Sequence, residues 1–263
     1  MDEQRSSMSI RSEKVNKVTE QIVLVTGSSG GIGAAIVDAL VERGDVVIGA
    51  DRVARENQNL ASFIDLDITD ESHTRDAVRA VIDRHGRLDA LVHTAGVLGE
   101  TVDPLSTTTA EFERIMQINA SGTFTIAREV ANAMLAAGTA GTLVLFSSVA
   151  AKEARVDYLP YNASKIAVLH VMWSFAKILG PNGISVNAVS PGPVNTEMWS
   201  QFAEQSGSAR AARDARARQL PMQRFAEPGE VARTVAFLTA VENRYLTGLS
   251  IDVAGGAHLG MGT

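Results

Sequence analysis

The feature that most constrains the fold is an alternation of short, uninterrupted apolar runs with longer segments of helical periodicity. The first run, residues 22–25, contains only Ile, Val and Leu, and a glycine-rich turn and a helical segment over 32–41 follow it. Uninterrupted runs rich in β-branched residues are typical of strands buried on both faces of a parallel sheet. The same pattern predicts further strands at residues 46–51, 62–64, 88–93, 143–146, 184–189 and 249–251. It predicts further helices at residues 71–85, 109–136, 158–179 and 228–240. Repeated strand–helix units with short connections indicate a doubly wound α/β fold.

The composition excludes several classes of function. The 24 Lys and Arg residues and 30 Asp and Glu residues give a net charge of −6, so the chain is poorly suited to hold nucleic acid or an anionic membrane by bulk charge. With 0 cysteines, disulfides, thiol catalysis and Cys-ligated zinc are excluded. The five histidines are scattered without metal-ligand spacing, and we expect no metal site.

The two ends of the chain differ in character. Residues 1–20 are polar and lack the apolar core of a secretory signal, and we interpret them as a mobile extension, with a start-site artefact as the alternative. Residues 21–263 show no linker or repeat, and their length suits a single α/β domain. No segment reaches the ~20 apolar residues of a membrane span. We therefore expect a cytoplasmic protein without membrane contacts.

A glycine-rich turn between the first predicted strand and helix indicates a nucleotide site. It reads Thr26-Gly27-Ser28-Ser29-Gly30-Gly31-Ile32-Gly33. Such glycines let the backbone turn tightly and approach a pyrophosphate, at which the following helix directs its N-terminal amides. Any tight strand-to-helix turn favours glycine, but the position inside a βαβ unit favours nucleotide binding. The expected contacts are Gly27, Ser29, Gly31, Ile32 and Gly33.

The end of the second predicted strand bears on the choice of cofactor. Asp51 would accept hydrogen bonds from the ribose hydroxyls of NAD and repel the 2′-phosphate of NADP. Arg52 favours the opposite choice, because an arginine stacks on adenine or reaches a phosphate, and a solvated strand-end carboxylate is the simpler alternative for Asp51. Asp67 and Ile68, after the third strand, would flank the adenine ring. We predict NAD in preference to NADP.

Tyr161 and Lys165 form the candidate catalytic pair. Four residues apart on a predicted helix, they lie on one face. A phenol has a pKa of about 10, and a nearby ammonium lowers it toward the range useful for acid–base catalysis. Such pairs are common on helix surfaces, but two further residues make this pair specific. Ser148 follows a strand at the sheet edge where ligands of open α/β folds bind, and Asn119 is an amide inside a helical segment.

These residues, in this order and spacing, resemble the pattern of the classical short-chain dehydrogenases/reductases. The resemblance covers residues 21–257 and also rests on Ala95-Gly96 and Pro191-Gly192. It implies a seven-stranded parallel Rossmann sheet, a nicotinamide cofactor and usually a homotetramer. The roles that it implies for the catalytic set are as follows: Tyr161 is the acid/base, Ser148 holds the substrate oxygen, Lys165 binds the nicotinamide ribose and polarises Tyr161, and Asn119 holds a water of the proton relay.

One segment departs from the family pattern. The family usually has Asn-Asn before Ala95-Gly96, and here the residues are His93 and Thr94. Ala95 and Gly96 would still let the cofactor pass close to the backbone, but the amide hydrogen bonds must be replaced or lost. We interpret His93 as a structural imidazole rather than a catalytic group. Tyr158 and Ser147 lie off the family spacing and are not assigned to the site.

The segment after the sixth predicted strand resembles the one that holds the nicotinamide carboxamide. The expected cofactor contacts there are Pro191, Gly192, Val194 and Thr196. An expected substrate lid covers about residues 195–222, in which Met198, Trp199 and Phe202 would form an apolar pocket wall, with core packing as the alternative. We interpret the arginines between residues 209 and 224 as a solvated helix face rather than a docking surface for an anionic carrier.

The sequence therefore predicts an NAD(H)-dependent oxidoreductase that interconverts a secondary alcohol and a ketone on a small, partly apolar substrate. Tyr161 would move the hydroxyl proton as hydride passes between that carbon and the nicotinamide, while Ser148 and Tyr161 hold the reacting oxygen. One alternative is a 3-oxoacyl-thioester (acyl carrier protein) reductase using NADPH, which Asp51 disfavours. The other is a non-catalytic nucleotide-binding protein, which would not need all four catalytic residues.

Overall fold

Seven parallel strands form one sheet in the order β3-β2-β1-β4-β5-β6-β7, which confirms the predicted doubly wound fold. The computed structural model describes residues 20–55, 59–100, 103–154, 157–197, 199 and 209–259. The strands are β1 (Ile22–Thr26), β2 (Val46–Asp51), β3 (Ser62–Asp65), β4 (Ala90–His93), β5 (Gly141–Phe146), β6 (Ile184–Pro191) and β7 (Ser250–Val253).

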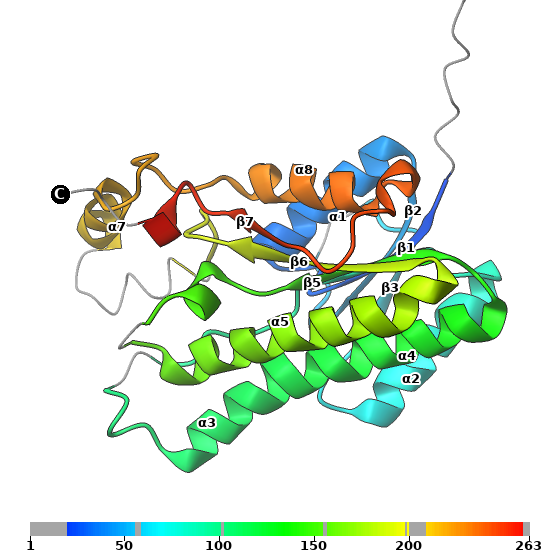
Figure 1. The fold of residues 1–263 in the computed structure, drawn as a ribbon, viewed down its shortest axis with the longest axis horizontal. Helices are drawn as coiled ribbons and strands as arrows, with labels where there is room; N and C mark the ends of the chain where they lie inside the picture. Colours follow the sequence, from blue (N-terminus) through cyan, green and yellow to red (C-terminus); the bar gives the residue numbers. More distant parts are fainter. Residues whose placement is uncertain are drawn as a thin grey trace, which may run out of the picture.

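Helices cover both faces of the sheet (Figure 1). On one face lie α1 (Gly31–Arg43) and α8 (Pro228–Thr239), and on the other α2 (Glu71–His85), α4 (Gly122–Ala137) and α5 (Leu159–Leu179). The remaining helices are α3 (Thr109–Met116) and α7 (Ala209–Arg218). No helix in the described ranges is both long and apolar enough to cross a bilayer.

The strand residues divide between two cores, which explains their uninterrupted apolar runs. Along β1, Leu24 packs toward α4 and α5, whereas Val23 and Val25 pack toward α1 and α8. Along β5, Leu145 and Val144 divide in the same way. Because successive side chains of a strand point to opposite faces, a strand covered on both sides must be apolar throughout.

The predicted helix over residues 109–136 is confirmed in its extent, but a π-helical turn divides it into α3 and α4. Between α3 and α4 the chain forms a π-helical turn, Gln117–Ser121, which contains Asn119. A π turn widens the helix by one residue per hydrogen-bonded ring and is frequent at functional sites. Here the side chain of Asn119 bonds to the backbone of Val97, 22 residues away, and this tertiary contact has no signature in local periodicity.

Two predicted segments fall mainly outside the described residues. Of the predicted extension over residues 1–20, only Glu20 is described, and of the predicted lid over about 195–222, residues 198 and 200–208 are not described. Met198 and Phe202 therefore lie outside the described residues. The end of the predicted lid forms α7, which lies near the end of β6 in Figure 1.

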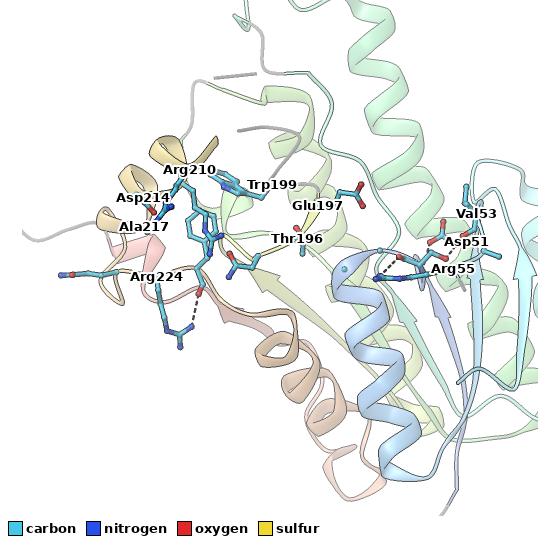
Figure 2. Close-up of a pocket in the computed structure, with 18 residues that line it drawn as sticks. Asp51, Val53, Arg55, Thr196, Glu197, Trp199, Arg210, Asp214, Ala217 and Arg224 are labelled. Carbon is cyan, nitrogen blue, oxygen red and sulfur yellow. Dashed lines mark hydrogen bonds between the residues drawn. The ribbon is translucent and has the colours of Figure 1, made fainter. Parts of the chain in front are cut away.

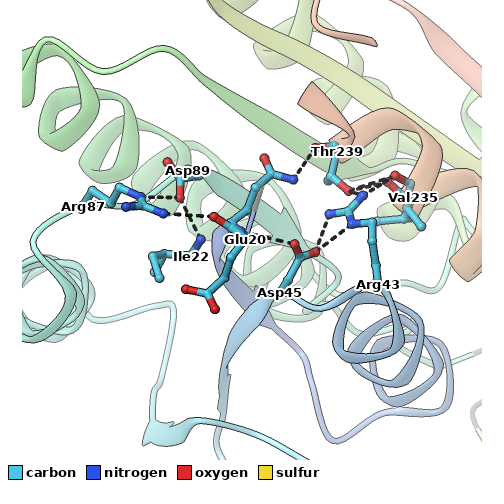
Figure 3. Close-up of polar contacts among 10 residues, drawn as sticks. Glu20, Ile22, Arg43, Asp45, Arg87, Asp89, Val235 and Thr239 are labelled. Atoms are coloured by element: carbon cyan, nitrogen blue, oxygen red, sulfur yellow. Dashed lines mark hydrogen bonds and ion pairs between the residues drawn. The ribbon is translucent and has the colours of Figure 1, made fainter. Parts of the chain in front are cut away.

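A buried ion pair ties α1 to α8 at the edge of the sheet opposite the glycine-rich turn (Figure 3). The Asp45 carboxylate, whose side chain is 0% exposed, accepts hydrogen bonds from Arg43 Nε at 2.8 Å and Nη2 at 2.5 Å. Arg43 Nη1 donates to the Ala236 carbonyl and to Thr239 Oγ1. Removing one partner of such a pair leaves a poorly solvated charge behind.

We expect Asp45→Ala to lower the free energy of unfolding by about 3 kcal/mol, because Arg43 loses its counter-ion. The matched control is Asp83→Ala, which breaks the exposed pair with Arg79 and should cost less than about 1 kcal/mol. Urea unfolding followed by circular dichroism measures both. Equal losses in the two variants would contradict a stabilising role for burial of the Asp45 pair.

Candidate active site

The turn between β1 and α1 is a cradle that requires glycine at two positions, Gly27 and Gly33. A Cβ on Gly33 would lie 2.0 Å from the carbonyl oxygen of Gly27, and a Cβ on Gly27 would lie 2.6 Å from the amide nitrogen of Ala95. Gly27 also has a positive φ of 72°. The N-cap of α1, Gly30, provides no side-chain cap, so the first amides of α1 remain for a ligand. These features fit a pyrophosphate.

A cleft of about 880 Å³ extends from this turn along the carboxyl ends of the strands. It reaches Phe146 and Tyr158 at its far side. The predicted cofactor contacts that line it are Gly27, Gly31, Ile32, Gly33, Asp51, Arg52, Asp67, Ile68, Ala95, Gly96 and Thr196. The glycine-rich turn and the N-terminus of α1 suit a pyrophosphate, and the carboxylate at the end of β2 suits a ribose. Together they fit a dinucleotide.

Asp51 lies at the point where the cleft meets the glycine-rich turn. Its carboxylate accepts hydrogen bonds from the amides of Ser29 at 3.0 Å and Arg52 at 2.7 Å. The Arg52 guanidinium lies 3.9 Å from the Asp67 carboxylate, and both side chains are well exposed. Hydrogen bonds from the hydroxyl and amide of Thr69, and then the charge of Arg52, hold the pKa of Asp67 below its usual range. Asp51 is thus fixed in place, while Arg52 is drawn toward Asp67.

Three predicted contacts at the end of β6 and directly beyond it lie in the packing of the sheet rather than in the cleft lining. Pro191 and Val194 are buried, and a Cβ on Gly192 would lie 2.9 Å from Cα of Ala254. Gly192 therefore permits the close approach of the chain after β7. Contact of these three residues with a cofactor stays a prediction.

Lys165 lies inside α5 with its ammonium at the end of β5. Its Nζ donates to the carbonyl oxygen of Phe146 at 2.9 Å and lies 5.6 Å from the ring centroid of Tyr161. Burial lowers the pKa of Lys165 to about 8. The i,i+4 spacing thus places the ammonium and the phenol beside each other, as the sequence predicts.

Asn119 anchors the loop after β4 to α5. Its Oδ1 accepts a hydrogen bond from the Val97 amide, and its Nδ2 donates to the Val97 carbonyl and to Ser164 Oγ. A Cβ on Gly96 would lie 3.0 Å from Asn119 Oδ1 and 3.4 Å from Lys165 Nζ, so these two side chains flank Gly96. Both amide protons of Asn119 are used in these contacts. Its predicted part in a water relay stays a prediction, and its contact with Ser164 was not predicted from the sequence.

Ser148 and Ser147 have different partners at the end of β5. Ser148 is the N-cap of a short 3₁₀ helix, Val149–Lys152, and its hydroxyl accepts a hydrogen bond from the Ala150 amide. Ser147 Oγ donates to the Lys165 carbonyl and thereby fixes α5 to the sheet. Ser147 is therefore structural, while Ser148 lies two residues beyond the carbonyl that holds the Lys165 ammonium. The four predicted catalytic residues all come from elements that meet at this one edge.

Comparison with known proteins assigns this arrangement to a family. The sequence pattern of the family described as Enoyl-(Acyl carrier protein) reductase matches residues 27–258. The chain belongs to the short-chain dehydrogenase/reductase family. It is therefore an oxidoreductase that acts on CH–OH groups with a nicotinamide dinucleotide as cofactor.

Related short-chain dehydrogenases/reductases differ in their activities. The L-fucose dehydrogenase of Oryctolagus cuniculus is 33% identical over 249 residues, which are 92% of this chain and 86% of that protein. A 3-oxoacyl-[acyl-carrier-protein] reductase of Thermotoga maritima is 31% identical over 248 residues, 90% of this chain and 97% of that protein. The ligand-free aldohexose dehydrogenase of Thermoplasma acidophilum has a TM-score of 0.86 and 27% identity, covering 92% of this chain and 95% of that one.

Thr94 replaces part of the missing asparagine pair of the short-chain dehydrogenase/reductase pattern. Its hydroxyl donates to the carbonyl oxygens of Thr26 at 2.8 Å and Gly27 at 3.2 Å, and so holds the start of the glycine-rich turn. A threonine directly after a strand, where the family has an amide, is the sequence signal for this role. His93 directly precedes Thr94 at the end of β4. Burial, and then the charge of Lys165, lowers the pKa of His93 to about 3.

A second groove, of about 1450 Å³, adjoins the cleft at Thr196 and Glu197. Figure 2 shows Trp199, Arg210 and Asp214 on one side of it and Asp51, Val53 and Arg55 on the other. The Trp199 ring packs edge-on against the Phe225 ring, with 4.9 Å between the ring centroids.

The charges of this groove are balanced. Arg224 is paired with Glu230, so that among the described lining residues three further arginines accompany three carboxylates. These are Arg55, Arg210 and Arg213, and Asp51, Glu197 and Asp214. The balance supports the interpretation of the α7 arginines as a solvated face. Trp199 belongs to this second groove and not to the described lining of the cleft at the glycine-rich turn. Its contact with substrate therefore stays a prediction.

Proposed function

We propose that this protein interconverts a secondary alcohol and a ketone with NAD(H) on a small, partly apolar substrate. The observation that carries the proposal is the buried Lys165 ammonium beside Tyr161, at the sheet edge where the glycine cradle opens. No described carboxylate forms an ion pair with Lys165, and burying an unpaired ammonium is costly. Beside Tyr161, the ammonium can lower the pKa of the phenol, which is a chemical reason for a lysine at this position.

Tyr161 is the proposed acid/base. With a pKa of about 8, Lys165 is mostly protonated at pH 7, and its charge stabilises the Tyr161 phenolate. The phenolate accepts the proton of the substrate hydroxyl in oxidation, and the phenol returns it in reduction. Ser148 holds the reacting oxygen, and Asn119 keeps the loop at Val97 in place. Hydride transfer is the chemistry that a nicotinamide, held by the residues that line the cleft, would supply.

The preference for NAD rests on the Asp51 carboxylate at the adenosine end of the cleft. Asp51→Ala is expected to lower the ratio of kcat/KM for NAD to that for NADP by about 100-fold. The reason is the loss of two charge-assisted hydrogen bonds to the ribose, about 1.5 kcal/mol each, and of the repulsion of a 2′-phosphate. Steady-state kinetics with both cofactors measure the ratio.

The matched control for this prediction is Asp65→Ala. Asp65 ends β3 and is the Cα partner of Asp51 across the sheet, but it does not belong to the described lining of the cleft. Its replacement should leave the ratio within threefold. A wild-type protein that prefers NADP would contradict the assignment of Asp51.

A second candidate function is the reduction of 3-oxoacyl thioesters with NADPH, which the relative of Thermotoga maritima supports. Assays of the purified protein with a panel of secondary alcohols and NAD, and with a 3-oxoacyl thioester and NADPH, separate the two. Turnover of only the thioester would overturn the main proposal. NADH binding without turnover in either assay would favour the non-catalytic alternative.

The proposal also includes the assembly and location expected for the chain. A homotetramer is supported by partly exposed apolar side chains on α4 and α5, namely Phe124, Ile166 and Trp173. Such side chains gathered on adjacent helices are typical of protein interfaces. We propose a cytoplasmic location and, for residues 195–222, a substrate lid over a single catalytic domain.

A further inference from the structure

His93 is the last residue of β4, and its imidazole lies on the sheet face covered by α4 and α5. It is only 1% exposed, and its Cα partners are Thr26 of β1 and Leu145 of β5. Leu145 and Leu91, which is two residues before His93, both belong to the core against α4 and α5. Because residues i and i+2 of a strand share a face, the imidazole points to the side on which Lys165 lies.

One nitrogen of this imidazole is bonded and the other is not. Nδ1 lies 2.6 Å from Thr26 Oγ1, whereas Nε2 is buried without a hydrogen-bond partner among the described residues. A buried polar atom without a partner costs about 1–3 kcal/mol. Leucine would fill the same space without this cost, so the imidazole calls for an explanation beyond packing.

The charged group that acts on His93 is Lys165. Burial, and then the charge of Lys165, lowers the pKa of His93 to about 3, so the imidazole is neutral near pH 7. Among the described residues, the Phe146 carbonyl and the Tyr161 ring lie next to the Lys165 ammonium, and Asn119 Oδ1 flanks Gly96 together with it. In the described part of the chain no carboxylate moves the pKa of Lys165, and burial alone lowers it. The ammonium has three protons, of which the Phe146 carbonyl accepts one.

We propose that His93 is a positioning residue that keeps Lys165 charged. In the proposed tautomer Nδ1–H donates to Thr26 Oγ1, and the Nε2 lone pair is turned toward the ammonium, to which one buried water would connect it. A neutral imidazole is suited to this task because it offers an acceptor without adding a second charge. The proposal rests on the proposed roles of Tyr161 and Lys165.

His93→Leu tests the proposal through the pH dependence of alcohol oxidation. Without the acceptor, Lys165 loses its proton at lower pH, and the Tyr161 phenolate is less stabilised. The acidic limb of kcat/KM should therefore move upward by about one pH unit, which is about a tenfold loss of rate on that limb. His93→Asn and His93→Gln, which retain an acceptor, should restore most of the shift.

His73→Leu is the matched control, since His73 is exposed on α2. A His93→Leu profile that coincides with that of His73→Leu would overturn the proposal. So would an asparagine variant shifted as far as the leucine variant, because a packing role would not depend on an acceptor.

The tautomer provides a test that needs no turnover. In ¹⁵N-labelled wild-type protein, the His93 signals can be assigned by their loss in His93→Asn. We expect a protonated Nδ1, an unprotonated Nε2 and no titration from pH 8 down to pH 5. A protonated Nε2, or titration within this range, would overturn the proposal even if His93→Leu failed to fold. Since this measurement is independent of activity, failure of the proposed function remains distinguishable from failure of this inference.

Discussion

Tyr161→Phe is expected to lower kcat at least about 1000-fold and to leave NADH binding nearly unchanged. The substitution removes the hydroxyl that transfers the proton, an effect of about 10²–10⁴-fold, and one donor to the reacting oxygen. The ring remains, and with it the contact with Lys165, whose Nζ lies 5.6 Å from the ring centroid. Steady-state kinetics and a fluorescence titration with NADH measure the two quantities on the same preparation.

The other two tyrosines serve as controls. Tyr245 is fully exposed, so Tyr245→Phe should leave kcat unchanged. Tyr158 lines the cleft three residues before Tyr161 but has asparagine, not lysine, four residues later. Tyr158→Phe should therefore retain turnover within about tenfold, the scale of one neutral hydrogen bond. If Tyr158→Phe abolished turnover and Tyr161→Phe did not, the catalytic assignment would be wrong.

The elements that were predicted best are those whose determinants are local. The predicted helix over 71–85 coincides with α2, because Asp70 caps its first turn and Gly86 ends it in a left-handed conformation. The turn between β1 and α1 was likewise evident, since its glycines and the buried run before it are adjacent in the sequence. In these places local preference and the overall fold agree.

The features that could not be predicted depend on contacts between distant residues. The π turn at Asn119 follows from its bonds to Val97 and Ser164, which lie 22 and 45 residues away. Helical periodicity passes through this region unchanged, so the sequence pattern predicted one helix. The hydrogen bonds of Thr94 to the glycine-rich turn depend in the same way on the pairing of β1 with β4.

The sequence predicted which residues belong to the candidate site better than it predicted how they are arranged. The i,i+4 spacing placed Tyr161 beside Lys165, because a helix fixes that relation regardless of the rest of the fold. The position of Trp199 against Phe225 depends on the chain beyond β6, for which the sequence offers no regular period. A contact between two residues of one helix is therefore easier to predict from the sequence than a pocket wall formed by a connecting segment.

Gly33→Ala is expected to raise the Kd for NADH at least about 100-fold, equivalent to about 2.7 kcal/mol. The added Cβ would lie 2.0 Å from the Gly27 carbonyl oxygen and 2.8 Å from the Gly27 carbonyl carbon. Both atoms belong to the backbone of the turn, so no side-chain rotation relieves the overlap. The first turn of α1 must move away from β1, and its amides then no longer meet the pyrophosphate.

Gly180→Ala is the matched control for this loss, because an added Cβ there meets nothing within 4 Å and its φ is −51°. It should bind NADH as the wild type does. Circular dichroism and the unfolding midpoint show whether Gly33→Ala retains its fold, so that loss of the site is distinguished from loss of the protein. A folded Gly33→Ala variant with wild-type affinity would mean that the cofactor does not depend on the close contact between α1 and the turn. The cleft from Asp51 to Tyr158 would then need another anchor for the dinucleotide.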